Sequence, residues 1–190
     1  MSDTGVLRTR AAEGLDRRAF SMADVEKMIE AGVLDPDERF ELIDGEIVPM
    51  NSQAMPHMLM RSRITNWLVK LAPAGVEVVT EATLLLGDNT FFETDVLAFT
   101  LDTTHRYVAP GLVHLAVEVA DTSRARDLFA KAPRYGAADV PELWVVELNE
   151  RTTYVFQRGA WADPKRISFD DWMAPSFLPG HQVRLADFEV

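Results

Sequence analysis

Three residues far apart in the chain could do chemistry together: an aspartate, a glutamate and a lysine. Glu118 interrupts an apolar run that reads as a strand buried on both faces, and Asp95 interrupts a second such run. A carboxylate is costly to bury in such a strand unless a cation or hydrogen-bond donors meet it. Lys131 falls on the helix expected after the Glu118 strand. Two carboxylates and an amine that converge from strand, strand and helix indicate a metal-dependent phosphodiesterase site.

The choice of metal follows from the composition. The chain contains no cysteine, which excludes disulfides and thiolate ligands. Oxygen or imidazole must then hold any metal, and this favours a hard cation such as Mg²⁺ or Mn²⁺. Asp95 and Glu118 would supply carboxylates, and the backbone carbonyl of Val119 could add a neutral ligand. A lysine near the attacking water can orient it or stabilise the charge that develops on the phosphoryl group.

Size and charge limit the class of protein. A chain of 190 residues with 47% hydrophobic and 26% charged residues is long enough for one domain with a core. The net charge of −11 argues against a protein that coats nucleic acid through bulk positive charge, although it allows a local basic groove. No apolar stretch approaches the roughly 18 residues that span a bilayer, and the N-terminus lacks a signal-peptide core. We therefore expect a cytoplasmic protein with no membrane partner.

The pattern of hydrophobic and turn residues predicts a flexible tail over residues 1–18 and one domain over 19–190. Ser21 can cap a first helix, Asp44-Gly45 is typical of a two-residue hairpin, and Pro56 begins a long amphipathic helix. A further helix over 124–138 should be interrupted at Pro133. Strands are predicted at 76–80, 82–86, 91–99, 112–120, 141–148 and 152–157, with a short one near 183–185. This order predicts a mixed α/β (α+β) fold, with a central mixed β-sheet flanked by helices.

Several motifs match one family in order and spacing. They are Glu41-Leu-Ile-Asp-Gly-Glu46, Asp95, residues 117–121 (Val-Glu-Val-Ala-Asp), residues 131–135 (Lys-Ala-Pro-Arg-Tyr) and residues 140–146 (Val-Pro-Glu-Leu-Trp-Val-Val). Through them the chain resembles the Uma2 family, restriction endonuclease-like proteins of the PD-(D/E)XK nuclease superfamily. The likeness runs from about residue 20 to about residue 156. It implies a PD-(D/E)XK core and a Mg²⁺-dependent endonuclease that acts on DNA as a homodimer.

The resemblance also implies roles for single residues. Asp95 would be the aspartate of the Pro-Asp motif and a metal ligand, although Thr94 stands where the family has proline. Glu118 would be the acid of the (D/E)XK motif and the second ligand. The usual lysine two positions later is replaced by Ala120, and Lys131 on the following helix matches the family's displaced lysine.

Other positions would support these three. Glu41 would be an extra acid that assists the metal or the lysine, and Tyr135 and Glu46 are further supporting candidates. Basic residues that could meet phosphates lie after the Glu118 strand and on the long helix. These nucleic-acid-binding candidates are Arg124, Arg126, Arg134, Arg61 and Arg63.

Each residue also has a structural explanation. Glu118 could form a structural ion pair, Lys131 could be a solvated helix residue, and Glu41 could face solvent from the hairpin. His57 is expected to be a helix-end or surface histidine. A rival class is a non-catalytic nucleic-acid- or protein-binding module that keeps the nuclease fold, and a third is a hydrolase of another phosphoester.

Overall fold

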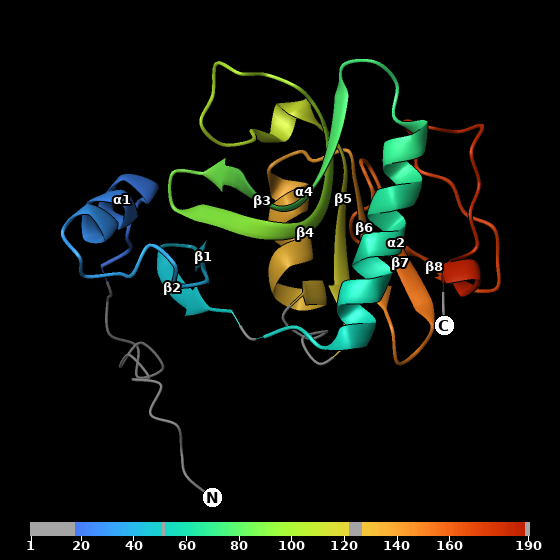
Figure 1. Ribbon diagram of the computed structural model, residues 1–190, viewed down its shortest axis with the longest axis horizontal. Helices are drawn as coiled ribbons and strands as arrows, with labels where there is room; N and C mark the ends of the chain where they lie inside the picture. The colour runs from blue at the N-terminus through green and yellow to red at the C-terminus, as the bar shows by residue number, and fades with distance from the viewer. Residues whose placement is uncertain (1–17, 51, 122–126, 189–190) are drawn as a thin grey trace, which may run out of the picture.

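The structure is a computed structural model that describes residues 18–50, 52–121 and 127–188. These residues form a central eight-stranded sheet with helices on both faces (Figure 1), which confirms the predicted mixed α/β architecture. The helices are α1 (Met22–Glu30), α2 (Met55–Leu71) and α4 (Ala132–Ala137), with short helical turns η2 (Pro110–Leu112), η3 (Asp127–Lys131) and η4 (Leu185–Phe188). The strands are β1 (Phe40–Ile43), β2 (Glu46–Pro49), β3 (Val76–Gly87), β4 (Thr90–Thr100), β5 (Val113–Ala120), β6 (Glu142–Glu147), β7 (Thr152–Gln157) and β8 (Lys165–Ser168).

The strands are joined in the order β2-β1-β4-β5-β6-β7-β8, and β3 pairs with β4. The β5–β6 pair is parallel, and the other pairs of described strands are antiparallel. Two layers of side chains cover the sheet. Met60, Ile64 and Leu68 of α2 pack on one face, as their helical spacing predicts, and Ala132 and Tyr135 of α4 pack on the other.

The N-terminal elements form as the sequence predicts. Ser21 caps α1 in a reciprocal capping box with Asp24. Asp44 and Gly45 both have positive φ, at 52° and 83°, and they close the tight turn between β1 and β2. In Figure 1, α1 and this hairpin lie together at one end of the molecule. The predicted tail falls, apart from Arg18, outside the described residues.

Two strands predicted separately, at 76–80 and 82–86, are one long strand. β3 pairs with β4 over almost its whole length, and Glu81 interrupts it with a φ of 53°. A left-handed backbone is uncommon for glutamate. In the sequence, the charged Glu81 interrupts the pattern of strand residues, and the prediction therefore divided β3 into two strands.

The helix predicted over 124–138 is also divided. Residues 124–126 lie outside the described part of the chain, the π-helical turn η3 ends at Lys131, and α4 begins at Ala132. Pro133 lies in the first turn of α4, where its missing N–H costs least, so the predicted interruption is confirmed.

The C-terminal prediction needs correction. Val183 forms only an isolated bridge with Met173, and Leu185 begins the turn η4 rather than ending a strand. The edge strand β8 was not predicted, because its four residues include a single apolar side chain, Ile167, and so lack a clear alternation. No helix in the described part of the chain is both long and apolar enough to cross a membrane.

The turn at Gly45 gives a test of how the β1–β2 hairpin is anchored. A Cβ atom on Gly45 would lie 2.5 Å from the Cβ of Ala19, whereas a Cβ on Gly32, also at positive φ, would meet nothing within 4 Å. We expect Gly32→Ala to lower the free energy of unfolding by about 1 kcal/mol, and Gly45→Ala by at least about 2 kcal/mol. Urea unfolding followed by circular dichroism measures both, and equal losses would contradict the contact with Ala19.

Candidate active site where two strands diverge

The candidate site begins where β4 and β5 stop pairing. Their ladder reaches the pair Val96 and Val117 and goes no further in that direction. The Asp95 side chain follows at this point, and its Oδ2 accepts a hydrogen bond of 2.9 Å from the backbone N–H of Val119. Asp95 and Glu118 are both buried. The aspartate is thus bonded to the residue that directly follows the glutamate.

Lys131 and Tyr135 both contact the Glu118 carboxylate. Nζ of Lys131 lies 3.2 Å from Oε1 of Glu118, and the Tyr135 hydroxyl donates a 2.6 Å hydrogen bond to the same oxygen. Tyr135 also lies 2.9 Å from the Thr94 hydroxyl. The π-helical turn η3 and the first turn of α4 therefore deliver an amine and a phenol to one strand carboxylate, as the motif spacing predicts.

Glu41 completes a three-group ion cluster. Nζ of Lys131 lies 2.7 Å from Oε1 of Glu41, which also accepts a 3.3 Å hydrogen bond from the backbone N–H of Glu93. The side chain of Glu41 is fully buried, so the alternative that it faces solvent from the hairpin is wrong. The Lys131 ammonium also lies 5.2 Å from the centre of the Phe92 ring, and its burial excludes the solvated alternative.

Among the described residues, the cluster of Glu41, Glu118 and Lys131 carries more negative than positive charge. One ammonium lies between two buried carboxylates, and Oε2 of Glu41 is a buried atom with no hydrogen-bond partner among the described residues. Such an arrangement is costly to desolvate and is stable only while all its members are present. An unsatisfied buried acceptor of this kind also suits a water molecule or a cation.

Asp95 lies among residues of α2 and of the segment before it. Nε2 of His57 lies 3.1 Å from Oδ2 of Asp95, Gln53 donates a 3.2 Å hydrogen bond to Oδ1, and Arg61 lies 3.8 Å from Oδ1. His57 is the third residue of α2, which agrees with the expected helix-end histidine, but it is buried, so the surface alternative is wrong. The spacing of four residues between His57 and Arg61 places them on one face of α2 and is the signal that could have predicted their shared role.

Tyr135 keeps its proton under all ordinary conditions. Burial, together with the negative charge of Glu118, raises the pKa of Tyr135 well above its usual value of about 10. The phenol is therefore a lasting hydrogen-bond donor to Glu118, and it holds that carboxylate without adding charge.

The remaining predicted residues lie elsewhere or are already engaged. Glu46 is exposed at the first residue of β2. Arg134 of α4 pairs with Asp44 in the turn between β1 and β2. Arg63 donates a hydrogen bond to the backbone carbonyl of Phe188. Arg124 and Arg126 lie outside the described residues. Of the basic candidates that the structure describes, Arg61 is the one beside Asp95.

The donor set suits a hard divalent ion that keeps part of its water shell. In the described part of the chain, no three His, Asp or Glu side chains gather closely enough to enclose a metal. Mg²⁺ is nevertheless often bound by one or two carboxylates, with waters and substrate oxygens completing the octahedron. Asp95 and Glu118 are the carboxylates that would hold such an ion, because the Asp95 carboxylate accepts a hydrogen bond from Val119, the residue next to Glu118.

Comparisons with known proteins identify the family of the chain and match its fold. The family model of Uma2, described as "Putative restriction endonuclease", matches residues 22–186, and the chain belongs to this family. The crystal structure of a protein from Anabaena variabilis, described as "a putative nuclease belonging to DUF820", is similar with a TM-score of 0.72 and 12% sequence identity. The match covers 89% of this chain and 97% of that one, and at this identity it shows a shared fold. The comparison with curated proteins gave no match.

The ion cluster predicts strong coupling between Lys131 and Glu41. Lys131→Met leaves two carboxylates buried without their cation, and we expect it to cost about 3–5 kcal/mol of stability. Adding Glu41→Gln restores the net charge of the cluster and should recover at least about 1 kcal/mol. A double-mutant cycle by urea unfolding measures this, and additive effects would contradict direct pairing.

The raised pKa of Tyr135 predicts that the folded protein loses stability at alkaline pH. Its pKa is raised in the folded protein, so its contribution is complete below about pH 10 and falls as pH rises above that unfolded-state value. The stability difference between wild type and Tyr135→Phe should therefore shift in favour of the variant between pH 9 and pH 11 (about one unit either side of pH 10). Urea unfolding at those pH values tests this, and a difference independent of pH would contradict it.

Proposed function

We propose that the protein is a Mg²⁺-dependent endonuclease-like hydrolase that cleaves phosphodiester bonds in DNA. The observation that supports the proposal is the hydrogen bond from the backbone of Val119 to Asp95 at the end of the β4–β5 ladder. There Asp95 is bonded to Val119, and Glu118 next to it is bonded to Lys131. Membership of the Uma2 family and the nuclease-like fold support the same reaction class.

Asp95 and Glu118, with the backbone carbonyl of Val119, would hold the Mg²⁺ or Mn²⁺ ion. When bound, such an ion neutralises charge on phosphoryl oxygens and makes a bound water more acidic. His57 and Gln53 hold the Asp95 carboxylate from the side of α2, while Tyr135 fixes Glu118 from the opposite face of the sheet. These contacts keep both carboxylates in place before substrate arrives.

Lys131 supplies the amine of the site. Glu41 and Glu118 hold its Nζ from two strands, so its position is determined before substrate binds. An ammonium there can donate a hydrogen bond to the attacking water or to a phosphoryl oxygen as negative charge develops. Glu41 acts through Lys131 and is therefore a positioning residue.

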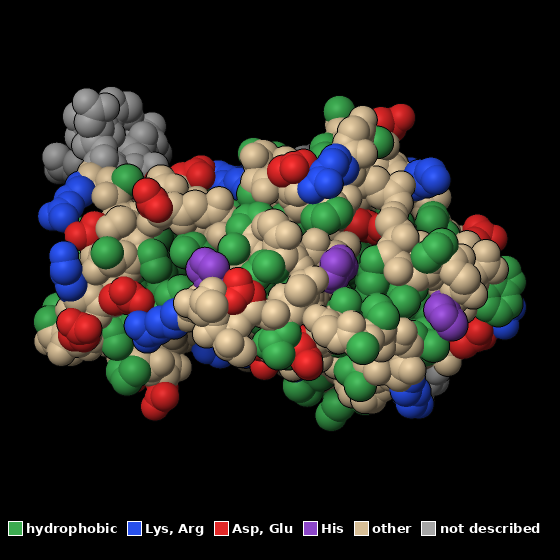
Figure 2. Space-filling model, turned by 90° about the horizontal axis from the view of Figure 1, so that it is seen from above, with side chains coloured by type: hydrophobic (Ala, Val, Ile, Leu, Met, Phe, Trp, Pro, Cys, Tyr) green, Lys and Arg blue, Asp and Glu red, His purple; other side chains and the backbone are tan. Residues whose placement is uncertain are grey.

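The mixed charges on the protein surface favour a limited contact with DNA. Figure 2 shows acidic and basic side chains interspersed over the face that it presents, without a broad basic field. The net charge of −11 has the same implication. Bound cations and Arg61 beside Asp95 would then carry most of the attraction for phosphate, which implies few phosphate contacts and a shallow dependence of binding on salt.

We also propose a homodimer in a cytoplasmic setting. Met55, Met58 and Leu59 are exposed apolar side chains of α2, and Met55 and Leu59 line a hollow of about 330 Å³. A second copy could cover this surface.

A second candidate function is a non-catalytic binding module that keeps the nuclease fold. The replacement of the strand lysine by Ala120 and the acidic net charge favour it. Isothermal calorimetry with Mg²⁺ and Mn²⁺ separates the two functions, because only the hydrolase requires an ion at Asp95 and Glu118.

The test is nicking of supercoiled plasmid with Mg²⁺ or Mn²⁺. We expect Asp95→Asn and the Glu41→Gln/Lys131→Met double variant to lower the nicking rate at least about 100-fold, because each removes a group that acts on the reacting phosphate. Glu41→Gln alone, with its lysine present, should retain more activity than the double variant.

Lys165→Met removes an exposed lysine on β8 and is the matched control, with the rate expected to stay within about twofold of wild type. Thermal unfolding of every variant shows whether the fold persists. Nicking by folded Asp95→Asn protein at the wild-type rate would refute the assignment.

A further inference from the structure

Two arginines from different parts of the fold converge on one carboxylate beside Asp95. Arg61 of α2 lies 3.0 Å from Oε1 of Glu81, and Arg39, which precedes β1, pairs with the same oxygen. Arg61 also donates a 2.8 Å hydrogen bond to Oε1 of Gln53. Two guanidinium groups therefore share a single carboxylate oxygen of Glu81, and the carboxylate of Asp95 lies 3.8 Å from Arg61.

The backbone at Glu81 is held in an unfavourable conformation. Its φ of 53° lies in the left-handed region, which is unfavourable for a non-glycine residue. The neighbouring pairs Thr80–Val96 and Ala82–Thr94 place Glu81 opposite Asp95 in the β3–β4 ladder. The strain thus lies directly across from the candidate metal ligand, where strained residues are often functional.

The position of the arginines suits a phosphate of a bound nucleic acid. Arg61 is only 3.8 Å from Oδ1 of Asp95, so an anion between the arginines would lie close to the reacting centre. A phosphate offers several oxygens to planar guanidinium groups, whereas Glu81 meets both arginines through one oxygen. A phosphate is therefore the better partner for the pair.

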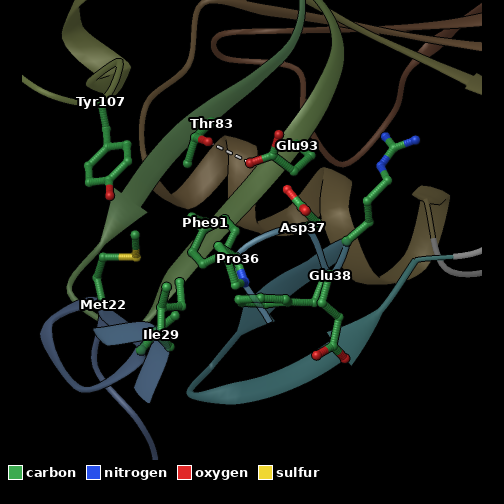
Figure 3. A pocket seen from close by; sticks show the side chains of 12 residues that line it. Met22, Ile29, Pro36, Asp37, Glu38, Thr83, Phe91, Glu93 and Tyr107 are labelled. Atoms are coloured by element: carbon green, nitrogen blue, oxygen red, sulfur yellow. Dashed lines mark hydrogen bonds between the residues drawn. The ribbon is translucent and has the colours of Figure 1, made fainter. Parts of the chain in front are cut away.

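One of the two arginines, Arg39, also borders open space. Arg39 lines a pocket of about 310 Å³ between α1 and the β3–β4 hairpin. Figure 3 shows Glu93 and Thr83, joined by a hydrogen bond, at one side of this pocket, and Tyr107 with Met22 at another. Asp37, Glu38 and Glu93 also line this pocket, so its acidic wall repels further phosphates and limits the contact to the arginines themselves.

We propose that Arg39 and Arg61 form a phosphate-binding subsite for the nucleotide next to the cleaved bond. The Glu81 carboxylate occupies this subsite in the absence of substrate, and a substrate phosphate displaces it. The inference rests on the proposed action on nucleic acid and goes beyond it, because it assigns a substrate contact to residues outside the Asp95, Glu118 and Lys131 group.

The test is equilibrium binding of a fluorescein-labelled DNA duplex of about 20 base pairs, measured by fluorescence anisotropy with Ca²⁺ in place of Mg²⁺ over a series of salt concentrations. Glu81→Gln removes the competing carboxylate, and we expect it to tighten binding about tenfold and to steepen the salt dependence. Adding Arg39→Gln should abolish the gain and reduce the salt slope by about one.

Asp170→Asn is the matched control, because it removes the same charge from an exposed pair with Arg151. It should change affinity less than twofold (about the effect of an exposed charge). Equal tightening by Asp170→Asn, no tightening by folded Glu81→Gln, or no binding of the duplex by that variant would each overturn the subsite.

The plasmid assay separates this inference from the proposed reaction. Tighter binding by Glu81→Gln without nicking by any variant would support the subsite and refute the hydrolase. Nicking by the wild type, with binding by Glu81→Gln unchanged, would support the hydrolase and refute the subsite.

Discussion

The buried ammonium of Lys131 is the group on which the centre of this structure depends. Glu41 on β1 and Glu118 on β5 are desolvated carboxylates that would otherwise repel each other across the sheet. The helical segment that covers this face brings the cation between them. The hairpin, the sheet and the covering helix therefore form one electrostatic unit, and packing alone would not explain why two acids lie inside an apolar core.

The fold was largely predictable because local signals agreed with the final packing. The Ser21 cap, the turn at Asp44 and Gly45 and the apolar stripe of α2 each have a short-range physical cause, and each forms as predicted. The prediction failed where local pattern and structure disagree. Glu81 disrupts the alternation within a continuous strand, and β8 takes its place at the sheet edge with hardly any apolar residues.

The candidate site was predictable to the extent that its residues stood out from their surroundings. Glu118 and Asp95 are conspicuous as acids in apolar strands, and the motif resemblance pointed to Lys131. The contacts of His57 and Arg61 with Asp95 depend on how α2 crosses the sheet, and a helical histidine or arginine is unremarkable in sequence. Single-sequence patterns show which residues are unusual, whereas tertiary packing decides which ordinary residues join them.

Ala120 stands where the (D/E)XK motif has its lysine, and its small size affects how α4 packs on β5. It is fully buried and shares one apolar cluster with Ala132 and Tyr135 of α4. The small methyl group lets the helix approach the strand closely enough for an amine to arrive from outside the sheet. A long side chain at position 120 would occupy that space and hold the helix away. A lysine at position 120 would therefore require the cluster around Ala132 and Tyr135 to repack.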